Sequence, residues 1–180
     1  MSSDLTAATG AQTGSFDIAQ ASRRLLEQSF NEGNLAVIDE FVAPDAMNHD
    51  PATPVEMRSL RGPEMLKRTV SMYRQAFPDV RIMVDDVIAA DDKVVLRWHS
   101  DGTHSGDLHG LAPTGVHASV TGVSIDQWKD GKVVEAWVEW DNLGLMRQLG
   151  AAPPAGSMGE KVGIGVQRLV ARRMRKKNEG

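Results

Sequence analysis

Three features of the sequence predict an α+β domain. Before Pro78 the apolar residues recur at helical spacing, and after it they alternate with polar residues as they do in strands. Asp130-Gly131, between two such strands, is a dipeptide typical of tight β-hairpin turns. Helices followed by a meander of hairpins favour a curved antiparallel sheet with helices packed on one face. The 180 residues suffice for one such domain with a short extra segment.

Three helices are predicted in the first half of the chain. They span about residues 16–30, 34–43 and 62–77. Asn34 is the expected N-cap of the second helix, which Pro44 ends. The third helix has Pro63 at its first position and is closed by Pro78.

Four strands and a closing helix are predicted after Pro78. The strands are expected over about residues 80–85, 93–100, 116–129 and 132–141. Asp130-Gly131 joins the last two as an antiparallel pair. Asn142 is the predicted N-cap of the closing helix, and Gly150 stops it.

The charges divide between the predicted domain and a C-terminal tail. Residues 160–180 contain seven Lys or Arg and two Glu, a net charge of +5, so the rest of the chain must have a charge of −9 to give the total of −4. An acidic domain disfavours nonspecific nucleic-acid binding, because neutralising phosphates requires clustered cations. We therefore expect a disordered segment over residues 1–15, a domain over residues 16–150, and a Pro/Gly linker with a basic helical tail over residues 151–180.

Composition excludes several classes of protein and site. The chain has no cysteine, which excludes disulfides, thiolate zinc sites and cysteine nucleophiles. It has no apolar run of about 18 residues, and residues 1–15 lack the pattern of a signal peptide. A cytoplasmic protein without a membrane segment is expected. The five histidines have no spacing typical of metal ligands, so no metal site is predicted.

One face of the last hairpin is predicted to combine acids with indoles. If the turn has two residues, Asp126 faces Glu135 across the hairpin. The residues expected on this face are Ser124, Asp126, Trp128, Glu135, Trp137, Glu139 and Asp141. Burial against an aromatic wall raises the pKa of a carboxyl and makes it a useful general base. The alternative is a solvated face whose acids keep the sheet soluble, and four acids together favour that alternative for some of them.

A set of short motifs occurs in a fixed order along residues 19–150. In order they are Phe30-Asn-Glu-Gly33, Phe41-Val-Ala-Pro-Asp45, Asn48-His-Asp-Pro51, Gly62-Pro-Glu64, Phe77-Pro-Asp79, Gly102-Thr-His-Ser-Gly106, Pro113-Thr-Gly115, Asp130-Gly-Lys-Val-Val-Glu-Ala-Trp137, Asp141 and Leu145-Met-Arg-Gln-Leu-Gly150. Each motif alone is weak, but the ordered set is specific. On these motifs the chain resembles the SnoaL-like polyketide cyclase family, within the nuclear-transport-factor-like superfamily.

The resemblance implies a cone of helices and curved sheet around an apolar cavity, with homodimers formed through the outer face of the sheet. It also implies catalysis without a metal or organic cofactor by an aspartate at the end of the last strand, which matches Asp141. The family's cyclases have a histidine near the position of Gln127, whereas this sequence has none after His117. His104 and His99 are the candidates to replace it, and stabilising the glycine-rich turn is the alternative role for His104.

The expected function is that of a cofactor-independent acid/base enzyme of secondary metabolism, a lyase or isomerase, acting on a hydrophobic carbonyl compound. Asp141 would remove a proton next to a carbonyl and start a polyketide cyclase-like aldol ring closure or isomerisation. The expected substrate-binding residues are Trp137, Trp128, Asp126, Arg97, Glu135 and His49. Two alternatives stay open: a hydroxylase- or hydrolase-type relative that activates water, and a non-catalytic module that binds a small ligand.

Overall fold

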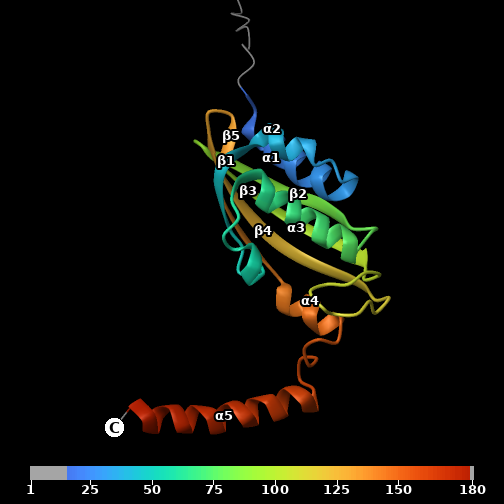
Figure 1. The fold of residues 1–180 in the computed structure, drawn as a ribbon, viewed down its shortest axis with the longest axis vertical. Coiled ribbons are helices and arrows are strands. Elements are labelled where there is room, and N and C mark those ends of the chain that lie inside the picture. Colours follow the sequence, from blue (N-terminus) through green and yellow to red (C-terminus); the bar gives the residue numbers. More distant parts are fainter. Residues whose placement is uncertain (1–15, 179–180) are drawn as a thin grey trace, which may run out of the picture.

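The computed structural model describes residues 16–178 and confirms the α+β class. One five-stranded sheet, in the order β1-β5-β4-β3-β2, curls around the helices without closing into a barrel (Figure 1). The helices cover its concave face, so the domain has a cone-like shape with an interior between the two layers. The segment predicted to be disordered, residues 1–15, lies outside the described residues.

Four of the five strands lie where the sequence alternation predicts strands. They are β2 (Arg81–Ala90), β3 (Lys93–Thr103), β4 (His117–Lys129) and β5 (Lys132–Trp140). Neighbours along the chain pair antiparallel, as in a meander. Asp130 and Gly131 have φ angles of 50° and 73°, which is the positive-φ pair that a two-residue hairpin turn requires.

The strand β1 (Val42–His49) is not predicted by the sequence. It pairs in parallel with β5 at one edge, so the sheet is mixed and not purely antiparallel. Its register shifts between Val42 and Met47, and Pro44 lies within that shift. The irregularity breaks the period of two by which a strand is recognised in a sequence.

Three helices pack on the concave face of the sheet: α1 (Ile18–Glu27), α2 (Ala36–Phe41) and α3 (Gly62–Ala76). Asp17 caps α1 by accepting the N–H groups of Ala19 and Gln20. The helix continues into a π-helical turn, η1 (Gln28–Glu32), which Gly33 ends at a φ of 69°. A short 3-10 turn, η2 (Val55–Met57), precedes α3.

Two buried tryptophans fix the core between the helices and the sheet. Trp98 Nε1 donates to Ser124 Oγ at 3.0 Å, and Trp128 Nε1 donates to Ser22 Oγ at 2.9 Å. A buried N–H group without a partner is costly, so these bonds stabilise the two ring orientations. The apolar residues buried around them include Leu25, Val37, Ile38, Phe41, Val70, Val84, Val94, Leu96 and Val133.

Gly62, at the start of α3, is a position where a side chain is expected to destabilise the fold. Its φ is 56°, and a Cβ would lie 2.1 Å from the carbonyl oxygen of Pro44. Gly62→Ala should therefore lower the free energy of unfolding by about 2 kcal/mol, through backbone strain and steric overlap together. Gly115→Ala is the matched control, because Gly115 has a φ of 71° with no atom near its Cβ position. The control should lose about 1 kcal/mol in urea unfolding, and equal losses in the two variants would contradict the prediction.

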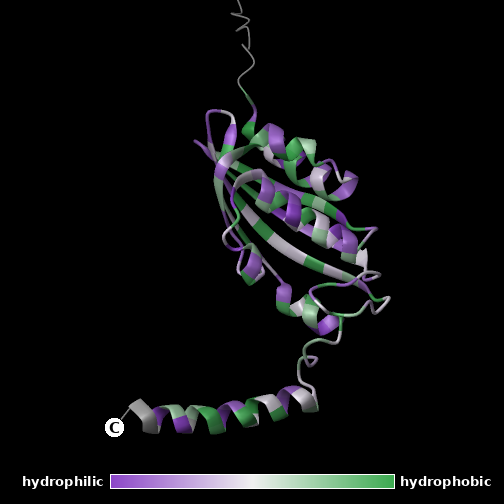
Figure 2. Cartoon of the chain, in the orientation of Figure 1, coloured by the Kyte–Doolittle hydropathy of each residue, from purple (hydrophilic) through white to green (hydrophobic). Residues whose placement is uncertain are grey.

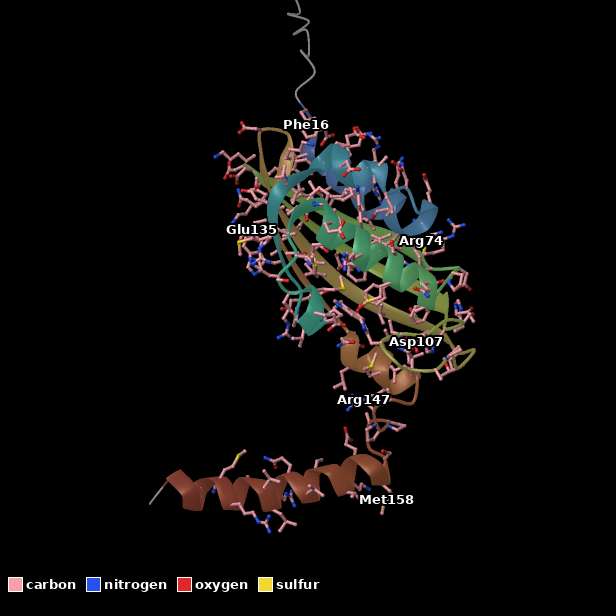
Figure 3. All side chains as sticks on the ribbon, viewed as in Figure 1. Phe16, Arg74, Asp107, Glu135, Arg147 and Met158 are labelled. Carbon is pink, nitrogen blue, oxygen red and sulfur yellow. The ribbon has the colours of Figure 1, made fainter. Side chains whose placement is uncertain are left out.

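The C-terminal helix α5 (Met158–Asn178) projects away from the domain (Figure 1). Arg147 anchors its start: its Nη2 lies 2.7 Å from Glu160 Oε1, and its Nε donates to the carbonyl of Pro153. Figure 3 shows Arg147 and Met158 at the two ends of this connection. The apolar side chains Val162, Ile164, Val166, Leu169 and Val170 are exposed, and Figure 2 shows apolar residues alternating with polar ones along the helix. Among the described residues, no helix is long and apolar enough to cross a membrane.

Candidate functional site

The helices and the inner face of the sheet enclose a cavity of about 150 Å³. Its walls are mostly apolar and include Leu26, Phe30, Leu66, Phe77, Val80, Ile82, Trp98, Ala118, Val120, Val138 and Leu145. Asn48, Asp50, Tyr73 and Trp140 are among its few polar lining residues. An apolar cavity with a small number of placed polar groups is typical of a small-molecule site.

Asp50 follows β1 directly and lines this cavity. Its Oδ1 accepts the N–H of Ala52 at 2.8 Å and the indole N–H of Trp140 at 3.3 Å. Within residues 16–178 no group donates a hydrogen bond to Oδ2, so this oxygen is available to accept a proton. Burial raises the pKa of the Asp50 carboxyl, the charge of Glu139 adds to the rise, and the two hydrogen bonds oppose it in part.

Tyr73, the only tyrosine in the sequence, lies on α3 beside Asp50. Its ring meets that of Trp140 edge-on, with 6.0 Å between centroids. Burial, and after it the charge of Asp50, raise the pKa of the Tyr73 phenol well above its ordinary value. The phenol is therefore neutral at physiological pH and can donate a hydrogen bond, as can the side-chain amide of Asn48.

A β-bulge changes the register of the last hairpin. The pair Trp128–Val133 forms as predicted, but the next pair is Gln127–Glu135, which leaves Val134 as an extra residue on β5. Because the side-chain period of a strand is two, one extra residue moves every following side chain to the other face. The prediction that Asp126 and the β5 acids share one face is therefore wrong, and Asp126 faces Ala136 instead.

Glu135, Trp137 and Glu139 consequently lie on the outer face of the sheet. His49 Nε2 is 2.7 Å from Glu135 Oε1, and the His49 ring stacks on Trp137 with 5.4 Å between centroids. Figure 3 shows Glu135 at the outer edge of the domain. None of these side chains lines the apolar cavity. His49, Trp137 and Glu139 instead line a separate surface pocket, which also includes Asn48 and Asp50.

His99 and Arg97 also belong to the outer face. His99 Nδ1 lies 2.8 Å from Asp85 Oδ1. Arg97 reaches the same carboxylate at 3.0 Å and that of Asp86 at 2.6 Å. Arg97 is therefore paired with neighbouring acids, and neither residue lines the apolar cavity.

Asp141, the predicted acid/base, occupies the N-cap position of α4 (Asn142–Gln148). Its Oδ1 accepts the N–H of Gly144 at 2.8 Å. The side chain is exposed and is not among the residues that line the cavity. In this arrangement the carboxylate stabilises a helix terminus and has no contact with the enclosed space.

His104, the predicted partner of Asp141, is fully buried within the glycine-rich turn. Its Nδ1 lies 3.1 Å from the hydroxyl of Thr114, and its ring packs on Phe77 with 5.2 Å between centroids. The ring is not among the cavity-lining residues. This placement fits the alternative role of stabilising the turn.

Asp126 is the predicted site residue that the structure places between the helices and the sheet. It lies on the inner face of β4, buried with 7% exposure, in a smaller chamber beside the main cavity. Burial raises its pKa to about 6, and a hydrogen bond from Ser22 opposes the rise. Trp128, which donates to the same serine, packs in the core and contacts neither chamber.

Sequence reasoning missed Asp50 and Tyr73 for different reasons. No strand is predicted before Pro78, so the sequence does not indicate that Asp50 lies beside the sheet. The signal that could have found it is the spacing of Asn48 and Asp50, two residues apart on either side of His49, which turns outward. Tyr73 belongs to the apolar stripe of its helix, which by itself indicates only core packing.

No group of three or more His, Asp or Glu residues in the described part of the chain is placed to hold a metal ion.

Residues 20–149 match the family described as SnoaL-like polyketide cyclase. The chain belongs to this family. Its resemblance to the family, inferred from ordered motifs, is thereby confirmed.

Named relatives of this SnoaL-like chain include cyclases. The aklanonic acid methyl ester cyclase AcmA of Streptomyces galilaeus is 32% identical over 136 residues, which cover 74% of this chain and 91% of AcmA. IdmH, a putative polyketide cyclase from Streptomyces antibioticus, is 31% identical with a TM-score of 0.59, over 73% of this chain and 99% of IdmH.

A third relative extends the similarity of the SnoaL-like chain beyond the domain. AclR, a putative hydroxylase from Streptomyces galilaeus, is 25% identical with a TM-score of 0.63, over 91% of this chain and 99% of AclR. The 91% of this chain that AclR matches is more than residues 1–150 contain. Part of residues 151–180 must therefore be matched in AclR.

Proposed function

We propose that this protein catalyses the intramolecular aldol ring closure of a hydrophobic carbonyl compound, with Asp50 as the acid/base. The observation on which this proposal depends is the environment of Asp50: one carboxylate oxygen without a hydrogen-bond donor, in an apolar cavity, beside the neutral phenol of Tyr73. A buried carboxylate with a raised pKa is a stronger base than an exposed one. The cyclase name of AcmA supports the same class of reaction.

In the proposed reaction Asp50 removes a proton from the carbon next to a carbonyl, and the electrons of the C–H bond form an enolate. The phenol of Tyr73 donates a hydrogen bond to the enolate oxygen. The enolate carbon attacks a second carbonyl of the same molecule, which forms the new C–C bond. The resulting alkoxide takes the proton back from Asp50, so the product is an isomer of the substrate.

The test uses the substrate class named for AcmA. Aklanonic acid methyl ester is incubated with the purified full-length protein without added cofactor, and the product is analysed by mass spectrometry and NMR. We expect a ring-closed isomer of unchanged mass. Absence of any ring-closed isomer, from this ester and from polyketide methyl esters of similar size, would overturn the proposal.

Addition of water is the second candidate, because AclR, a putative hydroxylase, matches more of this chain than AcmA does. In this alternative Asp50 would remove a proton from a water molecule, the resulting hydroxide would add to the substrate, and Asp50 would return the proton to the product. The product would be heavier by one water molecule, and ¹⁸O-labelled water would identify water as the source of the added oxygen. An isomer of unchanged mass would exclude this alternative for the substrate tested.

Tyr73→Phe is expected to lower kcat about tenfold, the effect of losing one hydrogen bond to the enolate oxygen while the donor of Asn48 stays in place. KM should change little, because the ring and its edge-on contact with Trp140 are retained. Steady-state turnover of the ring closure measures both constants. An unchanged kcat would remove Tyr73 from the mechanism.

We also propose that the chain forms a homodimer through the outer face of its sheet. That face exposes the apolar side chains Met83, Ile88 and Val123, and the apolar stripe of α5 has no partner within the described chain. The basic tail and the acidic domain have opposite net charges, which favours contact between copies. Native mass spectrometry should find a dimer for the full chain, with weaker association when the chain ends at residue 157. Monomers at micromolar concentration in both cases would overturn this proposal.

A further inference from the structure

The main cavity adjoins a second, deeper chamber of about 90 Å³. The residues that line both spaces, and along which they meet, are Leu26, Phe30, Asn48, Leu66, Ser124 and Val138. The deeper chamber adds Asp126 and Ser22 to otherwise mostly apolar walls. One end of a substrate that passes between these shared side chains from the main cavity would meet a carboxyl group.

The hydrogen bonds around Asp126 leave its carboxyl group free to accept a hydrogen bond from a ligand. The Ser22 oxygen accepts the indole N–H of Trp128 at 2.9 Å, so its own hydrogen is free to be donated to Asp126. A carboxyl group has about four acceptor positions. Over residues 16–178 Ser22 is the one side chain that bonds to it, which leaves acceptor positions for a ligand.

Ser124 supplies the complementary donor. It lies two residues before Asp126 on the same inner face of β4 and lines both chambers. Its oxygen accepts the indole N–H of Trp98 at 3.0 Å, which leaves its hydrogen to be donated to a ligand oxygen. The deep chamber thus offers one acceptor and one donor, both buried.

We propose that the deep chamber is a subsite for a hydroxyl group, at the end of the substrate farthest from the reacting carbon. The hydroxyl donates to Asp126 and accepts from Ser124, so both buried partners are satisfied by one neutral group. A carboxylate there would be repelled by Asp126. Because an apolar cavity of about 150 Å³ holds a benzene ring, the smaller chamber fits the hydroxyl and the edge of its ring, with the rest of the molecule in the main cavity. This inference rests on the proposed function, since it assumes an organic substrate in the cone.

The test compares the binding of two probes of nearly equal shape, 2-naphthol and 2-methylnaphthalene, to the full-length protein by fluorescence titration. The measured quantity is the ratio of their Kd values. Asp126→Leu should lower the preference for 2-naphthol by about tenfold or more, because the acceptor is lost. Asp126→Asn keeps an acceptor oxygen and should keep most of the preference. Asp50→Leu removes the acceptor at the other carboxyl group; it is the matched control and should leave the ratio unchanged.

Three outcomes would overturn the subsite: an unchanged ratio in Asp126→Leu, a loss of preference in Asp50→Leu, or tighter binding of the ammonium probe 2-naphthylmethylamine than of 2-naphthol. The last result would indicate a cation site. Circular dichroism confirms that each variant is folded, and the Asn variant provides the comparison if the Leu variant is not. Because the probes do not react, the subsite can fail while ring closure is observed, and ring closure can fail while the subsite is observed.

Discussion

Asp50→Asn is expected to lower kcat by about 10²–10⁴-fold, the usual contribution of a positioned acid/base. The amide has the size of the carboxylate and keeps an oxygen that can accept the N–H groups of Ala52 and Trp140. It cannot accept a proton, so the enolate cannot form. KM should stay within a few-fold of the wild-type value, because the apolar walls that bind the substrate are unchanged. Steady-state turnover, together with a melting curve to confirm folding, measures the effect.

Asp141→Asn is the matched control for this experiment. It makes the same chemical change at Asp141, the aspartate that the resemblance to the family indicates as the catalytic acid/base. Asn is as good an N-cap as Asp, so the cap of α4 and the stability of the protein should be retained. We expect kcat within about twofold of the wild-type value, since a side chain without cavity contact has no access to the reacting carbon. A loss in this variant equal to that in Asp50→Asn would return the catalytic role to Asp141.

The second large effect is on stability. Asp126 has a folded-state pKa of about 6 against an ordinary value of 3.8. Because the folded state binds this proton more tightly than the unfolded state does, the group's stabilising contribution is complete below about pH 4 and is lost as the pH rises through about 6. The shift corresponds to about 3 kcal/mol of unfolding free energy. Asp126→Asn does not titrate, so it should match the wild type near pH 4 and exceed it by up to about 3 kcal/mol above pH 7.

Urea unfolding of both proteins at several pH values checks this prediction. The informative quantity is the difference in unfolding free energy between the two proteins at each pH. Other acids change the unfolding free energy with pH in the opposite direction, and their effect is the same in both proteins. Asp79, for example, accepts hydrogen bonds from Thr103 that lower its pKa, so its contribution is lost as the pH falls. Parallel stability curves for wild type and Asp126→Asn would contradict the account of Asp126 as a buried, weakly partnered carboxyl.

Much of the fold could be predicted because its signals are local. Alternation located β2 to β5, and Asp130-Gly131 located the hairpin turn, because side-chain period and positive φ leave a direct trace in the sequence. The strand β1 could not be found in this way. Its register shift and Pro44 remove the alternation, and its pairing with β5 depends on residues about ninety positions away, as in His49 opposite Trp137.

The candidate site was harder to predict than the fold because it depends on one inserted residue and one missed strand. Val134 reverses the faces of β5, so Glu135 and Trp137 lie outside although their spacing from Asp126 indicated the inside. Asp50 enters the cavity only because β1 lies at the edge of the sheet. Asp126 lies on β4, which has no inserted residue, so it shares the inner face with Ser124 and Trp128.

Solvent-deuterium exchange measures the proposed removal of a proton from carbon by Asp50 without the later steps of ring closure. A carbonyl probe that lacks the second carbonyl cannot close a ring, so proton removal is the one step observed. In D₂O the wild-type protein and Asp141→Asn should introduce deuterium next to the carbonyl at similar rates, with the rate in Asp50→Asn lower by about 10²-fold or more. Equal exchange in wild type and Asp50→Asn, or loss of exchange in Asp141→Asn alone, would show that Asp50 is not the base.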